Sequence, residues 1–163
     1  MQDYVIVTGS TCDLPLATIE EKGIQVAPLT FSFGDEEYRD LPGGQELELT
    51  TFFQKLRSGQ MPTTAQVNLG TFTQIFSSVL QSGQDLLYIA FSSALSGTYN
   101  TAKLAAQKLA SSYPKQKIMV VDSRSGSLGQ GLLVEVAAKL KDGGQSLSEV
   151  YNWVADKSTR GQH

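Results

Sequence analysis

The chain has 163 residues, of which 40% are hydrophobic and 18% charged, and its formal net charge is −3, as expected for one soluble globular domain. The charge provides no basic surface for nucleic acid, no apolar run is long enough to span a membrane, and Met1 opens no signal-peptide pattern, so we expect a cytoplasmic protein. Cys12 is the only cysteine, so an internal disulfide is impossible, and with His163 as the only histidine the chain cannot form a Ser-His-Asp triad, a Cys-His dyad or a zinc site.

The first quarter of the chain is predicted to alternate between strands and helix. The run 4–7 predicts a strand, and a short helix follows a polar turn, with Asp13 as its N-cap, Pro15 in its first turn and Gly23 at its end. Residues 24–33 predict one strand.

In that strand Pro28 favours an edge or bulged position. Gly34-Asp35 predicts a tight turn that pairs the strand with residues 36–39. Thr50 is predicted to cap the next helix, and residues 61–66 are predicted to form a polar loop.

The rest of the chain gives stronger signals. Helical spacing of apolar residues predicts a helix over 69–80, and strands are predicted at 86–91 and 118–121. Alanine-rich and leucine-rich helices follow these two strands, and Ser146-Leu147-Ser148-Glu149 is a capping box that opens the last helix. Gly129-Gln130-Gly131 lacks the remaining parts of a dinucleotide-binding fingerprint.

This order of elements predicts an α/β fold, with a mostly parallel sheet and helices on both faces. Such sheets bind ligands where their strands end. A polar turn, residues 92–98, stands between the strand 86–91 and the helix that follows it. Its hydroxyls and the free N–H groups of the helix N-terminus suit a carboxylate or a phosphate. A simple capping role for Ser96 or Thr98 is the alternative.

Six segments, in order along the chain, resemble the DegV family. They are Val7-Thr8-Gly9-Ser10-Thr11-Cys12-Asp13-Leu14-Pro15, Val26-Ala27-Pro28-Leu29, Glu36-Glu37-Tyr38-Arg39-Asp40, Pro62-Thr63-Thr64-Ala65-Gln66, Ser92-Ser93-Ala94-Leu95-Ser96-Gly97-Thr98-Tyr99 and Val121-Asp122-Ser123. The resemblance implies the fold of the family's N-terminal domain and a non-enzymatic protein that holds one long-chain fatty acid, such as palmitate or oleate. It implies no cofactor or metal, and possible presentation of the fatty acid to a fatty acid kinase.

The resemblance also implies where the ligand carboxylate binds. The family's carboxylate-binding threonine and serine fall on Thr64 and Ser93. The other candidate ligand-binding residues are the neighbouring polar-turn residues Ser10, Thr63, Ser96, Gly97 and Ser123.

Three features depart from the family pattern. Gly9 stands where an aspartate is usual, and Ala65 where a serine is usual. The family's second, C-terminal domain is absent from these residues, so we expect one lipid-binding-type domain, residues 1–163.

Two other functional classes stay open. One is an enzyme acting on a phosphorylated small molecule, with Mg²⁺ held at the strand ends by Asp122 or Asp13. The other is an interaction protein with no ligand of its own.

A final expectation concerns self-association. If the helices of the fold are built to face a second domain, they should expose an apolar stripe and drive formation of a homodimer. The candidate residues are Leu147, Val150, Tyr151 and Val154, together with Phe72 and Phe76 as tunnel lining.

Overall fold

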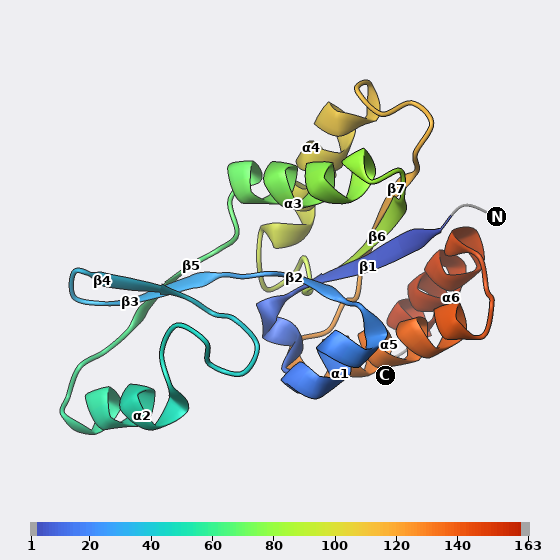
Figure 1. Cartoon of the computed structure of the whole chain (residues 1–163). Coiled ribbons are helices and arrows are strands. Elements are labelled where there is room, and N and C mark those ends of the chain that lie inside the picture. The colour runs from blue at the N-terminus through green and yellow to red at the C-terminus, as the bar shows by residue number, and fades with distance from the viewer. Residues whose placement is uncertain (1–2, 161–163) are drawn as a thin grey trace.

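A computed structural model describes residues 3–160, so His163 lies outside the described residues. Its centre is a parallel sheet in the order β2-β1-β6-β7 (Figure 1). The strands are β1 (Tyr4–Gly9), β2 (Gln25–Ala27), β6 (Asp85–Ala90) and β7 (Ile118–Asp122). Every residue of β1 and β6 is buried, as expected for the central strands of a sheet covered on both faces.

Two groups of helices cover the two faces of this sheet (Figure 1). On one face α3 (Leu69–Gln81) and α4 (Thr98–Ala110) pack over Val7 and Tyr88. On the other, α1 (Leu16–Lys22), α5 (Ser127–Asp142) and α6 (Leu147–Arg160) pack over Ile6 and Ile89. The predicted α/β class, with a mostly parallel sheet and helices on both faces, is confirmed.

The capping box at the start of α6 is also confirmed. The Glu149 carboxylate accepts the Ser146 backbone N–H at 2.9 Å, and the Ser146 hydroxyl oxygen accepts the Glu149 N–H at 3.2 Å. Two other predicted caps are wrong. Asp13 has a left-handed backbone (φ 54°) in the turn after the 3₁₀ helix η1 (Ser10–Cys12), and α1 begins after Pro15 instead. The helix α2 (Leu49–Arg57) begins two residues too early for Thr50 to cap it, and Glu48 occupies the N-cap position.

A second sheet projects from the first, and α2 lies beside its outer part, where Phe52 packs against Phe33 (Figure 1). It is antiparallel, in the order β4-β3-β5, with β3 (Thr30–Phe33), β4 (Glu36–Arg39) and β5 (Thr63–Ala65). The predicted hairpin through Gly34-Asp35 is confirmed by the pairing of Phe33 with Glu36.

Two predictions in this region are wrong. Residues 24–33 form two strands in different sheets, because Pro28 has no N–H to donate and the Leu29 N–H donates to the Ser10 hydroxyl oxygen at 3.1 Å. Residues 61–66 are not all loop, since Thr63–Ala65 pair with Thr30–Ser32 of β3. The polar composition of this segment reflects an exposed strand at the edge of a small sheet.

The expected exposed stripe is also wrong. Val150, Val154, Phe72 and Phe76 are all 0% exposed and Leu147 is 6% exposed, because they fill the cores beneath α6 and α3. Tyr151 is half-buried. Within residues 3–160 no helix combines the length and the apolar character that crossing a membrane would require.

Candidate functional site

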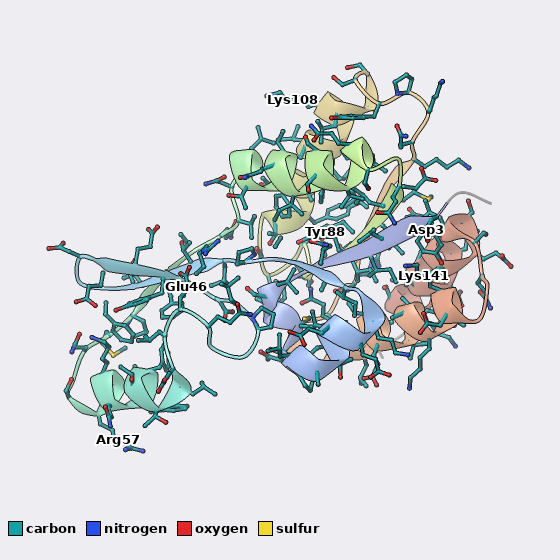
Figure 2. The ribbon with its side chains drawn as sticks, in the orientation of Figure 1. Asp3, Glu46, Arg57, Tyr88, Lys108 and Lys141 are labelled. Carbon is teal, nitrogen blue, oxygen red and sulfur yellow. The ribbon has the colours of Figure 1, made fainter. Side chains whose placement is uncertain are left out.

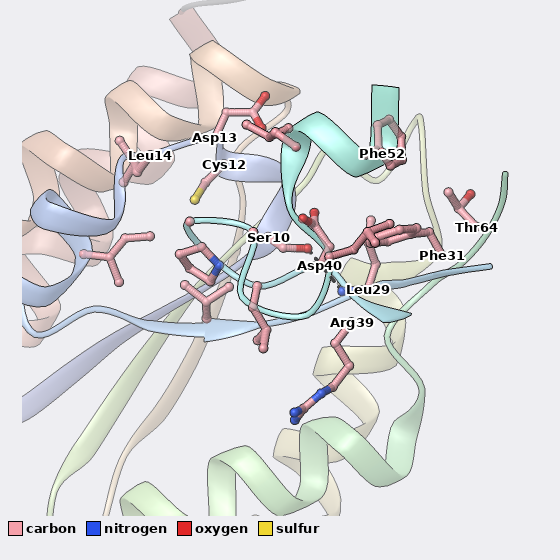
Figure 3. A pocket seen from close by; sticks show the side chains of 18 of the residues that line it. Ser10, Cys12, Asp13, Leu14, Leu29, Phe31, Arg39, Asp40, Phe52 and Thr64 are labelled. Carbon is pink, nitrogen blue, oxygen red and sulfur yellow. Dashed lines mark hydrogen bonds between the residues drawn. The ribbon is translucent and has the colours of Figure 1, made fainter. Parts of the chain in front are cut away.

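A cavity of about 570 Å³ opens between the parallel sheet, the antiparallel sheet and α2 (Figure 3). Its walls come from η1 and α1, the connection between β2 and β3, the loop after β4, and the first turn of α2. Most of the lining is aliphatic or aromatic: Leu14, Ile19, Val26, Leu29, Phe31, Leu41, Pro42, Leu47, Leu49, Phe52 and Pro62. Such a lining suits a flexible apolar chain.

Polar side chains interrupt this lining at a few points. Ser10 and Asp40 lie side by side (Figure 3) and form a side-chain hydrogen bond. Burial raises the pKa of the Asp40 carboxyl above its ordinary value, and the nearby charge of Asp13 acts in the same direction, whereas the bond to Ser10 lowers it. The charged form of Asp40 is therefore disfavoured where it faces the cavity.

An ion pair fixes the loop that closes one wall. Glu46 Oε2 lies 2.6 Å from Arg39 Nη2, and Glu46 Oε1 accepts the Arg39 backbone N–H. These bonds lower the pKa of Glu46. They tie the loop after β4 back to the end of that strand, and they leave the guanidinium of Arg39 with a carboxylate partner of its own.

A second, smaller cavity of about 120 Å³ lies beside the first. The two share Ser10 and Leu29 in their linings. The remaining lining of the smaller cavity comes from β1 and η1, the end of β2, the start of α4, the strand β6 with the turn after it, and the segment that follows β5. These residues are Gly9, Thr11, Ala27, Gln66, Val67, Tyr88, Phe91, Ser96 and Thr98.

The turn before α4 forms its own network. The Ser93 hydroxyl donates to Asp122, and the hydroxyls of Ser96 and Thr98 are hydrogen-bonded to each other. The Ser96 oxygen also accepts the Thr98 N–H at 3.2 Å, so Ser96 does support the helix start, although Gly97 occupies the N-cap position.

The seven candidate residues are distributed unevenly around the two cavities. Thr64 lines the larger cavity, Ser96 the smaller and Ser10 both. The other four, Ser93, Thr63, Gly97 and Ser123, line neither of these two cavities.

Two of those four have clear local roles. Ser123 is 0% exposed, and its hydroxyl donates to the Ser125 carbonyl at 3.1 Å. A Cβ on Gly97 would lie 3.2 Å from Gln66 Oε1, so the turn before α4 lies against the segment that follows β5. The structure thus brings together two of the polar segments that the sequence analysis singled out.

Sequence reasoning missed Asp40 and Tyr88 as cavity residues. Asp40 follows a hairpin strand, and its position within the Glu36–Asp40 motif was the available signal. Tyr88 lies inside the apolar run of β6, where a pattern of buried residues hides a hydroxyl.

The turn that carries Ser10 is held from behind by α5. Gln130 is fully buried: its side-chain N–H donates to the Thr8 hydroxyl oxygen at 2.9 Å, and its Oε1 accepts the Thr11 hydroxyl at 2.9 Å. Gly131 packs on Cys12, where a Cβ would lie too close to the Cys12 carbonyl oxygen. The Gly129-Gln130-Gly131 segment therefore packs the start of α5 against the turn after β1.

The acidic residues proposed for Mg²⁺ are engaged differently. Asp122 accepts hydrogen bonds from Ser93 and from the Arg124 backbone N–H, whereas Asp13 lines the larger cavity. In the part of the chain from 3 to 160, no three acidic, cysteine or histidine residues converge as a metal-binding group.

Comparison with known proteins identifies the family of this chain. A sequence model described as "Uncharacterised protein, DegV family" matches residues 3–162. A DegV domain-containing protein of Clostridium perfringens is 41% identical over 160 residues, which are 98% of this chain and 55% of that protein.

Solved structures show the same fold. A DegV family protein from Thermus thermophilus, described for its fatty acid binding, superposes with a TM-score of 0.82 at 34% identity, covering 98% of this chain and 54% of the other. DegV from Bacillus subtilis, described as a fatty acid binding protein, gives a TM-score of 0.83 at 26% identity, covering 98% and 55%. The chain spans about half the length of the curated relatives it matches. On the family match and the identity of these relatives, the chain belongs to the DegV family.

Proposed function

We propose that this chain binds one long-chain fatty acid, such as palmitate or oleate, with its acyl chain in the larger cavity. The observation that carries the proposal is an apolar-lined cavity of about 570 Å³ with hydroxyl groups at its margin. That volume falls within the roughly 300–1,000 Å³ of small-molecule sites. The fatty acid binding described for the relative from Thermus thermophilus supports the same ligand class.

Thr64 and Ser93 are the proposed contacts of the carboxylate. Thr64 lies on the exposed strand β5 at the margin of the larger cavity, and Ser93 lies in the turn before α4. Hydroxyl donors and a nearby helix N-terminus stabilise an anion without a fixed cation. Ser10, Thr63, Ser96, Gly97 and Ser123 remain candidates from the same polar segments.

The protein acts as a cytoplasmic carrier without catalysis or a cofactor in this proposal, and the bound acid is presented to a fatty acid kinase. Support for the kinase as partner comes from the family resemblance. Formation of a homodimer stays a prediction. The exposed stripe on α6 from which it was argued is buried in the structure, so that argument no longer supports it.

Equilibrium binding to delipidated protein tests the function. We expect saturable displacement of a fluorescent fatty acid by micromolar palmitate and oleate. Glycerol 3-phosphate with Mg²⁺ serves as the probe for the alternative enzyme class and should displace nothing. Saturable binding of the phosphate compound, with none of the fatty acids, would overturn the proposal.

A further inference from the structure

The smaller cavity contains a buried hydroxyl that nothing in the described protein satisfies. Tyr88 lies on the central strand β6, beneath α3, and is 0% exposed (Figure 2). Its hydroxyl is fully enclosed and has no hydrogen-bond partner among residues 3–160. A buried hydroxyl without a partner is unfavourable by roughly 1–3 kcal/mol, so a hydrogen-bond acceptor in the cavity is expected to bind there.

Neighbouring rings hold the side chain in place. The ring of Tyr88 packs against Phe72 at 5.1 Å and Phe76 at 5.7 Å between centroids. Its hydroxyl lies 3.5 Å from the position that a Cβ on Gly9 would take. Burial raises the pKa of Tyr88, which keeps the phenol protonated and able to donate.

The cavity around this hydroxyl suits an uncharged oxygen. Ala27, Val67 and Phe91 supply apolar walls, and no lysine or arginine lines it within the described chain. The Ser96–Thr98 pair uses one hydroxyl proton internally, so only one proton of that pair remains for a ligand. The other possible donor in the lining, the side-chain amide of Gln66, is also neutral. Beside the enclosed Tyr88 hydroxyl an ionised carboxylate would lose its water without gaining a positive partner, unlike at the exposed Thr64, whereas a hydroxyl or carbonyl oxygen needs only one neutral donor.

The smaller cavity also adjoins the proposed site of the acyl chain. Because it shares Ser10 and Leu29 with the larger cavity, an acyl chain in the larger cavity passes beside it. Its volume of about 120 Å³ corresponds to about four water molecules, which is enough for a substituent on the chain.

We propose that Tyr88 and the smaller cavity form a subsite for an oxygen carried on the acyl chain, so that the protein prefers oxygenated fatty acids such as hydroxy acids. This inference rests on the proposed function. Tyr88 donates its phenolic hydrogen to the chain oxygen, while the carboxylate of the ligand binds elsewhere.

The test compares stearate with hydroxystearates that carry the hydroxyl at different carbons. Affinities are measured by displacement of a fluorescent fatty acid from the delipidated full chain. Wild-type protein should bind at least one hydroxystearate about threefold to tenfold more tightly than stearate, as expected for one neutral hydrogen bond. In Tyr88→Phe this ratio should fall to about one.

Two further variants sharpen the result. Tyr4→Phe is the matched control, since the Tyr4 hydroxyl donates to the Gln145 carbonyl at 2.7 Å and lines neither cavity; it should keep the ratio. Gly9→Ser places a hydroxyl beside Tyr88. It should lower the preference for hydroxystearate over stearate while the Tyr88 side chain stays in place.

Each outcome separates the two proposals. If stearate binds but no hydroxystearate is preferred, or if the preference survives in Tyr88→Phe, the subsite is overturned and the fatty-acid function stands. If neither stearate nor any hydroxystearate binds wild-type protein, both proposals fail.

Discussion

The hydroxyl of Ser93 donates to the carboxylate of Asp122, whose other oxygen accepts the Ser93 backbone N–H at 3.2 Å. This contact joins the turn after β6 to the end of β7, where Ala90 and Asp122 are register partners. A fatty acid carboxylate bound to Ser93 would therefore stand beside a second carboxylate.

Replacing Asp122 with asparagine should raise the affinity for palmitate. The Ser93 hydroxyl has one proton, so it must turn away from Asp122 to donate to the ligand. Asparagine is an uncharged acceptor that competes less for this proton, and it removes the like charge, whose repulsion is worth about 1 kcal/mol at about 4 Å in water. We expect about fivefold tighter binding at low ionic strength, and a smaller gain in high salt. Asp35→Asn, in the exposed β3–β4 turn, is the control and should leave affinity unchanged. Weaker binding by Asp122→Asn would contradict a carboxylate at Ser93.

Thr64→Val should weaken palmitate binding by about 1.5–3 kcal/mol, the range for a hydrogen bond to a charged group. The free energy of unfolding should change little, because Thr64 is exposed. Thr159→Val on α6, whose hydroxyl donates to the Ala155 carbonyl at 3.1 Å, controls for loss of a threonine hydroxyl.

The neighbouring Thr63 gives a stricter test. Adjacent residues of a strand point to opposite faces, and Thr64 lines the larger cavity whereas Thr63 does not. A larger loss of affinity in Thr63→Val than in Thr64→Val would refute the assignment of Thr64.

Much of the fold could be predicted from the sequence because its strongest signals are local. The apolar runs of β1 and β6 and the helical spacing of Phe72, Phe76 and Val79 are consequences of burial in the elements that contain them. The cavities could not be predicted in this way. Their walls join Ser10, Asp40 and Tyr88, which are far apart in the chain and belong to η1, the loop after β4 and the strand β6.

The errors have physical causes. No periodicity marks the change of sheet at Pro28, since it depends on the long-range bond from the Leu29 N–H to Ser10. The strand Thr63–Ala65 is exposed and polar, so nothing in its composition distinguishes it from a loop. The apolar face of α6 is covered by the sheet within this domain, which explains why the expected exposed stripe is absent from the described helix.

Asp40 should make stability depend on pH. Its pKa in the folded protein is raised above the ordinary value of 3.8, so between these two values the folded state keeps a proton that the unfolded state has released. Stability therefore falls as pH rises through that window. Asp40→Asn should raise the unfolding temperature at pH 7 and have little effect below pH 3.8. An equal shift at both pH values would show that the cause is not the titration of Asp40.

Two tyrosine hydroxyls should differ in their effect on stability. Tyr4→Phe removes the bond to the Gln145 carbonyl and should lower the free energy of unfolding by about 0.5–1.5 kcal/mol. Tyr88→Phe removes a hydroxyl without a partner in the described protein and should leave stability of the delipidated protein unchanged or higher. Denaturant unfolding of both variants checks this, and a greater loss in Tyr88→Phe would contradict it.

Gly131→Ala should lower the free energy of unfolding, although alanine is normally more favourable than glycine inside a helix. The new Cβ would press on the carbonyl oxygen of Cys12 and displace the turn that carries Ser10, at a cost of about 1–3 kcal/mol. Gly70→Ala in α3 is the control, because its Cβ would meet only Asn68 Oδ1 at 3.4 Å. Alanine there should be neutral or stabilising by up to about 1 kcal/mol. Thermal unfolding of the pair would show whether the contact with Cys12, or helix propensity alone, decides the effect.

The most direct test of the central claim is a titration of delipidated, ¹⁵N-labelled protein with palmitate, followed by amide correlation spectra. If the acyl chain binds in the larger cavity, the shifts should saturate at micromolar ligand and concentrate at cavity residues such as Leu29, Asp40 and Thr64. The absence of saturable shifts, or shifts confined to the remote ends of α5 and α6, would contradict it.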